Sequence, residues 1–105
     1  MGARDRFNAG YADWKYFRNN LNKLFYDDAA RKKAAQGRRA MDESGAEVGH
    51  APTADGFHIS DWVTCACGWE SPHFWDGMDL AFDEWYEHVH DSLIAEFDDA
   101  GVGHA

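Results

Sequence analysis

The chain has 105 residues, the size of one small domain, and this length excludes a multidomain enzyme or a repeat array. Its sixteen aromatic residues outnumber the ten Leu, Ile and Val residues, so a folded core must depend on aromatic side chains. A formal net charge of -9 with so few aliphatic residues approaches the composition of disordered proteins, and we therefore expect a stabilising element beyond hydrophobic packing.

The charges are divided unevenly along the chain. Residues 1–41 contain all ten basic residues and four acidic ones, which gives a formal charge of +6. The remaining 64 residues contain fifteen acidic residues and neither Lys nor Arg, which gives -15. The basic segment can neutralise the acidic one within a monomer, or one end of the chain can bind a partner or another copy.

An apolar stripe begins close to the N-terminus. Its members recur at steps of three and four residues, the spacing of one helix face, and we expect them to bind a protein partner: Phe7, Tyr11, Trp14, Phe17, Leu21, Leu24 and Phe25. Beyond Asp27, strong helix formers continue the helix as far as a C-cap near Gly37. The sequence therefore predicts a long amphipathic helix in a basic arm, residues 1–41.

The same arm offers nucleic-acid binding as an alternative. Five basic residues are candidates for contacts with phosphates: Arg31, Lys32, Lys33, Arg38 and Arg39. However, phosphates would repel the acidic remainder of the chain, and the arm's aromatic residues lie largely on the stripe rather than on the basic face. These two points favour a protein partner or self-assembly over nucleic acid.

A linker and a second unit follow the arm. Residues 42–56 contain four Gly or Pro residues and few large apolar side chains, which is typical of a linker. Residues 57–64 have the composition and alternation of a strand, and residues 65–68 form a turn into a short second strand near Trp69.

A second helical face follows the predicted hairpin. It begins near Met78 and continues at helical spacing to Phe97, with acidic residues in its first turns, where the helix dipole favours them. The predicted fold class is α+β, with an N-terminal helix, a linker and an acidic hairpin-plus-helix unit, residues 57–105.

Two cysteines and a histidine supply the parts of a metal site. Cys65 and Cys67 are separated by one residue, so a disulfide between them would be strained. His88 borders the buried face of the second predicted helix, one turn after Trp85, and can face the turn that carries the cysteines. Zn²⁺ binds thiolate and imidazole tetrahedrally, so we predict a zinc ion that staples the hairpin to the helix; two small buried thiols are the alternative.

The fourth zinc ligand is left open by the spacing. His58 on the predicted strand and His73 after the hairpin are the best-placed histidines. His90 is a poor candidate, because two residues along a helix rotate by about 200°. Glu84 and Asp91 are carboxylate alternatives at helical spacings from the histidine ligand.

Two further histidines, His50 and His104, are expected to take no part in the site.

A resemblance supports the ligand assignment. The stretch from Trp62 to Ser71, followed by Ala81, Trp85 and His88, resembles a family of small zinc-binding proteins of actinobacteria and their bacteriophages, with C-x-C-G-W-x-S and A-x-x-x-W-x-x-H segments. The resemblance covers roughly residues 57–95 and rests on six positions: Cys65, Cys67, Gly68, Trp69, Trp85 and His88. It implies that the two cysteines and His88 are metal ligands, and it implies no defined biochemical activity.

The expected function is therefore binding rather than catalysis. A unit of about fifty residues leaves little room for a substrate pocket. The sequence contains no H-E-x-x-H motif, no H-x-E with P-C-x-x-C, no glycine-rich phosphate loop and no nucleophile elbow, so we expect neither an enzyme nor a small-molecule substrate. No apolar run is long enough to span a membrane. We expect a zinc-binding interaction or structural accessory protein in the bacterial cytoplasm or a virion, the alternative being a nucleic-acid-binding regulator.

Overall fold

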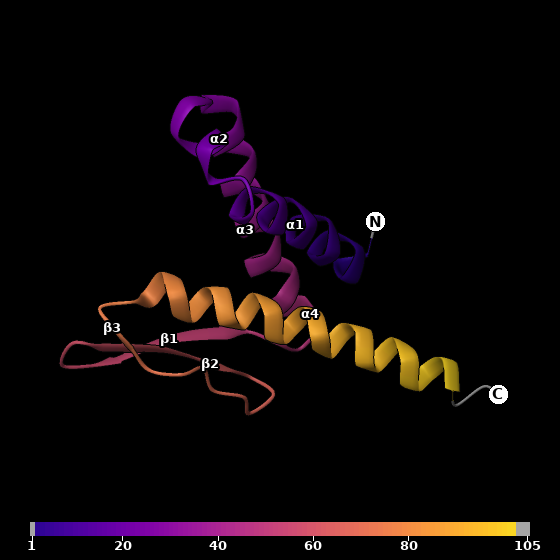
Figure 1. The fold of residues 1–105 in the computed structure, drawn as a ribbon. Coiled ribbons are helices and arrows are strands. Elements are labelled where there is room, and N and C mark those ends of the chain that lie inside the picture. The colour runs from indigo at the N-terminus through magenta and orange to yellow at the C-terminus, as the bar shows by residue number, and fades with distance from the viewer. Residues whose placement is uncertain (1, 103–105) are drawn as a thin grey trace. The chain divides into compact units, whose positions relative to one another are not determined.

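The computed structural model describes residues 2–102, with side chains through residue 95. The fold is α+β, as the sequence predicts: three helices are followed by a three-stranded antiparallel sheet and a long fourth helix (Figure 1). The chain divides into two compact units, unit 1 up to Val48 and unit 2 from Gly49 onward.

Unit 1 is a pair of packed helices with a short helix between them. The three helices are α1 (Ala3–Arg18), α2 (Leu21–Tyr26) and α3 (Asp28–Glu47). α1 packs along α3 (Figure 1). The predicted apolar stripe faces the interior along α1, where Phe7, Trp14 and Phe17 are buried. Met41 of α3 is also buried. Aromatic side chains therefore form much of this core, as the composition predicts.

The chain turns twice where the sequence predicts one continuous helix. After α1 the side-chain amide of Asn20 donates a hydrogen bond to the Tyr16 carbonyl oxygen at 2.7 Å. Before α3 the Asp27 carboxylate accepts hydrogen bonds from the backbone N–H groups of Ala29 and Ala30 at 2.9 and 3.3 Å, which caps the new helix. Asn and Asp side chains form hydrogen bonds with backbone groups that would otherwise pair within a helix. They therefore end a helix even where the spacing of the apolar residues would allow it to continue.

Gly37 lies in the middle of α3 rather than at its end. A Cβ atom placed on Gly10 of α1 would lie 2.5 Å from the Gly37 carbonyl oxygen, and one placed on Gly37 would lie 3.1 Å from the Gly10 carbonyl oxygen. The two glycines allow the backbones of α1 and α3 to approach closely, and this packing offsets the low helix propensity of glycine.

The predicted linker, residues 42–56, is reduced to residues 48–51. α3 continues through the first six residues of the predicted linker, and a strand begins at Pro52. Gly and Pro suggested a break, but Gly45 is buried within the helix and Pro52 is the first residue of its strand, a position that tolerates proline. Unit 1 therefore extends beyond residue 41 and includes three more acidic residues, which lowers its formal charge to +3 and leaves -12 in unit 2.

Unit 2 is a small sheet covered on one face by a helix. Its elements are β1 (Pro52–Phe57), β2 (Ser60–Cys65), β3 (Phe74–Trp75) and α4 (Met78–Val102). The strand order is β1-β2-β3, and both pairs are antiparallel. α4 packs on β2, and the buried side chains of these two elements are Val63, Cys65, Ala81, Trp85, Tyr86, Val89 and Leu93.

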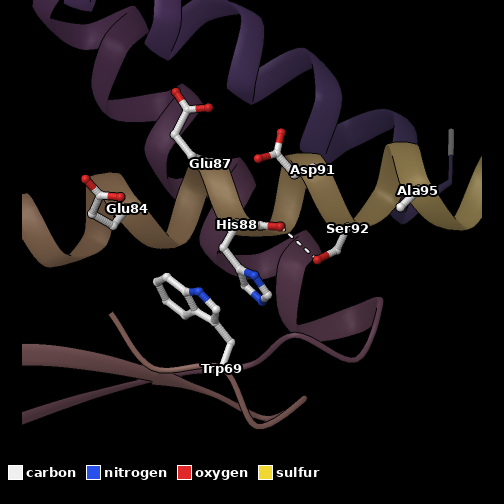
Figure 2. Close-up of a pocket in the computed structure, with 7 residues that line it drawn as sticks. All are labelled: Trp69, Glu84, Glu87, His88, Asp91, Ser92 and Ala95. Carbon is white, nitrogen blue, oxygen red and sulfur yellow. Dashed lines mark hydrogen bonds between the residues drawn. The ribbon is translucent and has the colours of Figure 1, made fainter. Parts of the chain in front are cut away.

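One side of α4 borders an open groove. The groove has a volume of about 390 Å³, and three acidic side chains of α4 line it: Glu84, Glu87 and Asp91 (Figure 2). Trp69 and His88 also line the groove.

The hairpin differs from the predicted one. The predicted strand, residues 57–64, contains the end of β1, the turn and most of β2, since Phe57 pairs with Ser60. β1 has one β-branched and one aromatic residue, Thr53 and Phe57, and its last five residues are exposed. Its identity as a strand therefore depends on its pairing with β2. The second strand predicted near Trp69 is a single bridge between Thr64 and Glu70.

Among the residues that the structure describes, no helix combines the length and the apolar character that crossing a membrane requires.

The close approach of α1 and α3 gives a first prediction. Gly10→Ala should destabilise unit 1 by about 1–3 kcal/mol, because the added methyl group collides with backbone atoms of α3. Thermal and urea unfolding followed by circular dichroism would measure this. Gly2→Ala is the control, since its Cβ atom would meet nothing within 4 Å. A Gly10→Ala protein as stable as the unmodified chain would contradict the close contact.

Candidate metal centre

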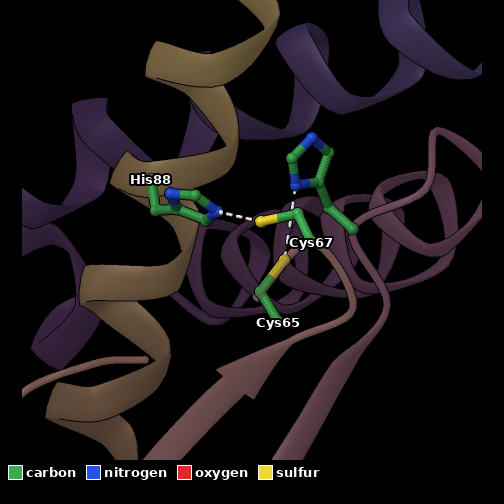
Figure 3. Close-up of side chains that lie close together, drawn as sticks. Cys65, Cys67 and His88 are labelled. Carbon is green, nitrogen blue, oxygen red and sulfur yellow. Dashed lines mark hydrogen bonds between the residues drawn. The ribbon is translucent and has the colours of Figure 1, made fainter. Parts of the chain in front are cut away.

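Four side chains from separate positions in unit 2 converge on one point. They come from the segment before β1, the end of β2, the turn after β2, and α4: His50, Cys65, Cys67 and His88. One ligand atom from each side chain lies within 4.8 Å of all the others, and Figure 3 shows His88 facing the cysteine side chains. Cysteine sulfur and imidazole nitrogen are metal donors, so this group can hold a metal ion.

The separations between donor atoms suit a tetrahedral ion. The Nδ1 atom of His50 lies 3.3 Å from the Sγ atom of Cys65, and the Sγ atom of Cys67 lies 3.2 Å from the Nε2 atom of His88. Zn–S bonds of about 2.3 Å and Zn–N bonds of about 2.0 Å would separate neighbouring donors by about 3.5 Å. Both measured separations are therefore close to those of a tetrahedral zinc site.

A tight turn after β2 holds the two cysteines. The Gly68 N–H group donates to the Cys65 carbonyl oxygen at 2.9 Å, and the Cys65 N–H group donates to the Trp69 carbonyl oxygen at 2.8 Å. Gly68 has a φ of 101°, in the left-handed region that favours glycine. The glycine of the Cys-x-Cys-Gly sequence is thus required by the conformation of the turn.

The register of β1 and β2 brings His50 to the same turn. Pro52 pairs with Cys65, and one residue farther out the Ala66 N–H group donates to the Ala51 carbonyl oxygen at 3.0 Å. The next residue in this antiparallel register is His50, which therefore lies opposite the second cysteine.

Ser71 fastens the segment after the turn to β2. Its hydroxyl oxygen accepts a hydrogen bond from the Val63 N–H group at 2.9 Å and donates one to the Pro72 carbonyl oxygen at 2.9 Å. Its own N–H group donates to the Val63 carbonyl oxygen at 2.9 Å. The side chain is 3% exposed, so this residue supplies a buried and satisfied polar link beside the metal centre.

The imidazole of His88 is held by ring stacking. The Trp69 ring stacks on it with the centroids 4.3 Å apart and the planes inclined by 5°. One turn later on α4, the Ser92 hydroxyl donates to the His88 carbonyl oxygen at 2.8 Å (Figure 2). Trp69 therefore shields one face of the imidazole and restricts its rotation.

Burial shifts the pKa values of Cys65 and His88 toward their neutral forms. Burial raises the pKa of the Cys65 thiol above its usual value. Burial, followed by the repulsion of the nearby His50, lowers the pKa of His88. His88 is thus kept in the neutral form that binds metal, whereas Cys65 retains a proton that a metal ion must displace.

Three of the predicted ligands are brought together, and the two candidates for the fourth position are not. Cys65, Cys67 and His88 belong to the donor group. His58 lies in the hairpin turn with an exposed side chain, and its ring contacts Phe57 with the centroids 4.1 Å apart. His73 also lies outside the donor group, so neither of the two histidines preferred for the fourth position belongs to it.

His73 is engaged on the other side of β2. It stacks on Trp62 with the ring centroids 4.0 Å apart, and its Nε2 atom lies 3.2 Å from the Glu70 Oε2 atom. The remaining candidates on α4, His90, Glu84 and Asp91, are also outside the donor group.

The expectation that His50 takes no part is wrong. The sequence pattern places the first strand at residues 57–64, and this placement leaves His50 within the predicted linker. Recognising β1 would have found it, since pairing Pro52 with Cys65 puts the residue two positions earlier opposite Cys67. His104 lies outside the described residues.

The predicted partner-binding stripe is divided between interior and surface. The sequence predicts that Phe7, Trp14 and Phe17 bind a partner. They are buried in the folded chain, so their side chains are covered by unit 1 itself. Tyr11 and Leu24 are half-buried. Only the two remaining members of the stripe, Leu21 and Phe25, are exposed, because α2 leaves the line of α1.

The predicted nucleic-acid contacts are likewise divided. Arg31 donates hydrogen bonds to the Leu24 and Phe25 carbonyl oxygens at 2.7 and 3.2 Å and pairs with a neighbouring aspartate, so it closes the end of α2. Lys33 lies 3.9 Å from the carboxylate of Asp13.

The other three residues of that set lie on α3 as well. Lys32 and Arg39 are exposed and Arg38 is half-buried. Arg31 and Lys33 thus lie close to carboxylates of unit 1, whereas Lys32 and Arg39 are exposed.

No protein-family model matches the chain, and no curated protein or solved structure shows significant similarity to it. The resemblance to the actinobacterial and bacteriophage proteins therefore remains a prediction from the sequence.

The raised pKa of Cys65 gives a prediction for metal binding. Zn²⁺ affinity should increase as the pH is raised from about 6 to about 8, because the ion competes with the proton on the thiol. Calorimetric titration in buffers of different ionisation enthalpy would count the protons released. Cys65→Ser should release fewer protons than the unmodified chain, whereas an affinity independent of pH would contradict the prediction.

Proposed function

We propose that this chain is a non-catalytic zinc-binding protein, in which a zinc ion stabilises unit 2 and the exposed surfaces bind another protein. The observation that carries the proposal is the convergence of two cysteines and two histidines, with one ligand atom of each within 4.8 Å of the others. Four donors from four places along the chain tie together the entry to β1, the turn after β2 and α4.

The donor set favours zinc over other ions. Two sulfur and two nitrogen donors in a tetrahedron are typical of structural zinc sites, whereas Ca²⁺ and Mg²⁺ prefer oxygen ligands. Catalytic zinc sites generally use three protein ligands and leave the fourth position for water or substrate. A site with four protein donors is therefore better suited to holding a fold together than to catalysis.

The small core of unit 2 gives the ion a structural purpose. Its sheet has only three strands, one of them two residues long, and β1 is exposed along most of its length. Domains of this size often need a metal or disulfides in addition to packing. The metal would supply the link between the sheet and α4 beyond the contacts of Val63 and Trp85.

A protein partner is favoured over nucleic acid. The exposed aromatic side chains of α2 offer an apolar contact surface, whereas Arg31 is engaged by carbonyl oxygens of α2. The charge of +3 on unit 1 is also weaker than the first 41 residues suggested. We propose an interaction or structural accessory role, in the cytoplasm or in a virion, consistent with the actinobacterial and bacteriophage resemblance.

The metal proposal is tested by comparing two histidines. The chain purified under reducing conditions should bind one zinc ion, measured by native mass spectrometry and elemental analysis, and chelation should lower its melting temperature. His50→Ala should weaken zinc binding at least about tenfold, since it removes one donor of four. His58→Ala is the matched control, and it should bind zinc normally because its side chain lies in the hairpin turn.

Two results would contradict the proposal. One is reduced protein that contains no stoichiometric metal and has the same melting temperature with and without added zinc. The other is equal zinc affinity of the His50→Ala and His58→Ala proteins, because the donor group would then not include His50.

A further inference from the structure

Nearly all of the large apolar side chains exposed among the described residues fall into two groups. Tyr16, Leu21, Phe25 and Tyr26 form one group at the α2 end of unit 1, which we call the basic patch. Phe57, Ile59, Trp75 and Leu80 form the other around the hairpin turn of unit 2, which we call the acidic patch. Ile94 alone lies in neither group.

The two aromatic side chains that α2 contributes to the basic patch are not buried in the core. α2 contains no buried residue, and Phe25 and Tyr26 are 77% and 91% exposed. Lys23 donates a hydrogen bond to the Tyr16 hydroxyl and lies 5.0 Å from the centre of its ring. Arg18 also lies at this end of unit 1 and is exposed. Together with Lys23 and Arg31 it outnumbers the two carboxylates that follow α2, Asp27 and Asp28, so the patch carries a net positive charge.

The acidic patch combines exposed apolar side chains with carboxylates. Trp75 of β3 is 78% exposed, and its strand is joined to the hairpin turn by a hydrogen bond from the Asp76 N–H group to the Ile59 carbonyl oxygen at 2.7 Å. A groove of about 410 Å³ beside it is lined by Asp61, Asp76 and Asp79 together with Leu80. Unit 2 contains no Lys or Arg, so no basic side chain of its own can neutralise these carboxylates.

We propose that the basic patch of one copy of this chain docks on the acidic patch of a second copy. This inference rests on the proposed function, and it identifies the surface to which the protein partner binds. Each patch offers exposed aromatic side chains to bury, and the two patches carry opposite charge, so contact between unlike patches gains both apolar burial and Coulomb attraction. Two acidic patches, or two basic patches, would repel each other.

A second copy is the occupant that satisfies both surfaces. A nucleic acid would contact the basic patch and be repelled by the acidic one, and a basic protein would use only the acidic patch. Because each copy carries one patch of each kind, every contact joins unlike patches, and successive contacts either close into a ring or continue as an open chain.

The proposal is tested by measuring association of the full zinc-loaded chain. Sedimentation velocity between about 10 µM and about 1 mM should show a mass that rises with concentration. Raising the salt from about 0.05 M to about 0.5 M should weaken the association without abolishing it, because apolar contacts are not screened. Phe25→Ala and Trp75→Ala should each weaken it at least about tenfold. Ile94→Ala, outside both patches, is the control and should leave it unchanged.

Mixing the two variants gives the sharpest result. A Phe25→Ala copy retains the acidic patch, and a Trp75→Ala copy retains the basic patch. Their mixture should form one-to-one dimers that grow no further, whereas each variant alone should stay monomeric at the same concentration. Circular dichroism and zinc content of every sample would exclude unfolding as the cause.

Three outcomes would overturn the inference. They are a chain that remains monomeric at about 1 mM, a mixture of the variants that fails to associate, and association that requires co-purified nucleic acid. Zinc content separates this failure from failure of the proposed function: a monomeric protein with one bound zinc overturns only the docking, whereas a protein without zinc overturns the metal centre.

Discussion

Two sulfur atoms and two imidazole nitrogens must meet within a few ångströms, although their residues are spread over nearly forty positions of the sequence. Much of the local structure of unit 2 serves this requirement. The left-handed Gly68 closes the turn between the cysteines and Trp69, and the register of β1 on β2 carries His50 to the same place. α4 must then pack with Trp85 and Val89 inward while His88 points toward the turn.

The two units are stabilised by different means. Unit 1 depends on packing, with aromatic side chains of α1 buried and with Gly10 and Gly37 at the point where α1 and α3 approach most closely. Unit 2 has a thinner core and a cluster of metal donors at one end of its sheet. The high aromatic content of the chain is therefore divided between interior packing, the stacking of Trp69 on His88, and exposed side chains at two separate places.

The sequence predicted the α+β class, the amphipathic N-terminal helix and the convergence of Cys65, Cys67 and His88. These features depend on local signals, namely helical spacing and a cysteine turn. The sequence did not predict the turns around α2. The apolar residues keep their helical spacing across these turns, although Asp27 caps a new helix there. β1 was missed because its exposed, Gly- and Asp-containing sequence is a strand only by virtue of pairing with β2. That error also concealed His50, whose position depends on a register rather than on a motif.

The segregation of the basic residues has a consequence for studying the protein by chemical means. Trypsin cleaves after Lys and Arg, and the last such residue is Arg39, within α3. Trypsin cannot cleave the rest of the sequence, which includes all of unit 2. A tryptic digest would therefore contain it as one long acidic fragment, whether or not it is folded. Lysine acetylation, ubiquitination and amine-directed cross-linking are equally confined to unit 1. Peptide maps and footprints of unit 2 therefore require proteases and reagents directed at acidic, aromatic or cysteine residues.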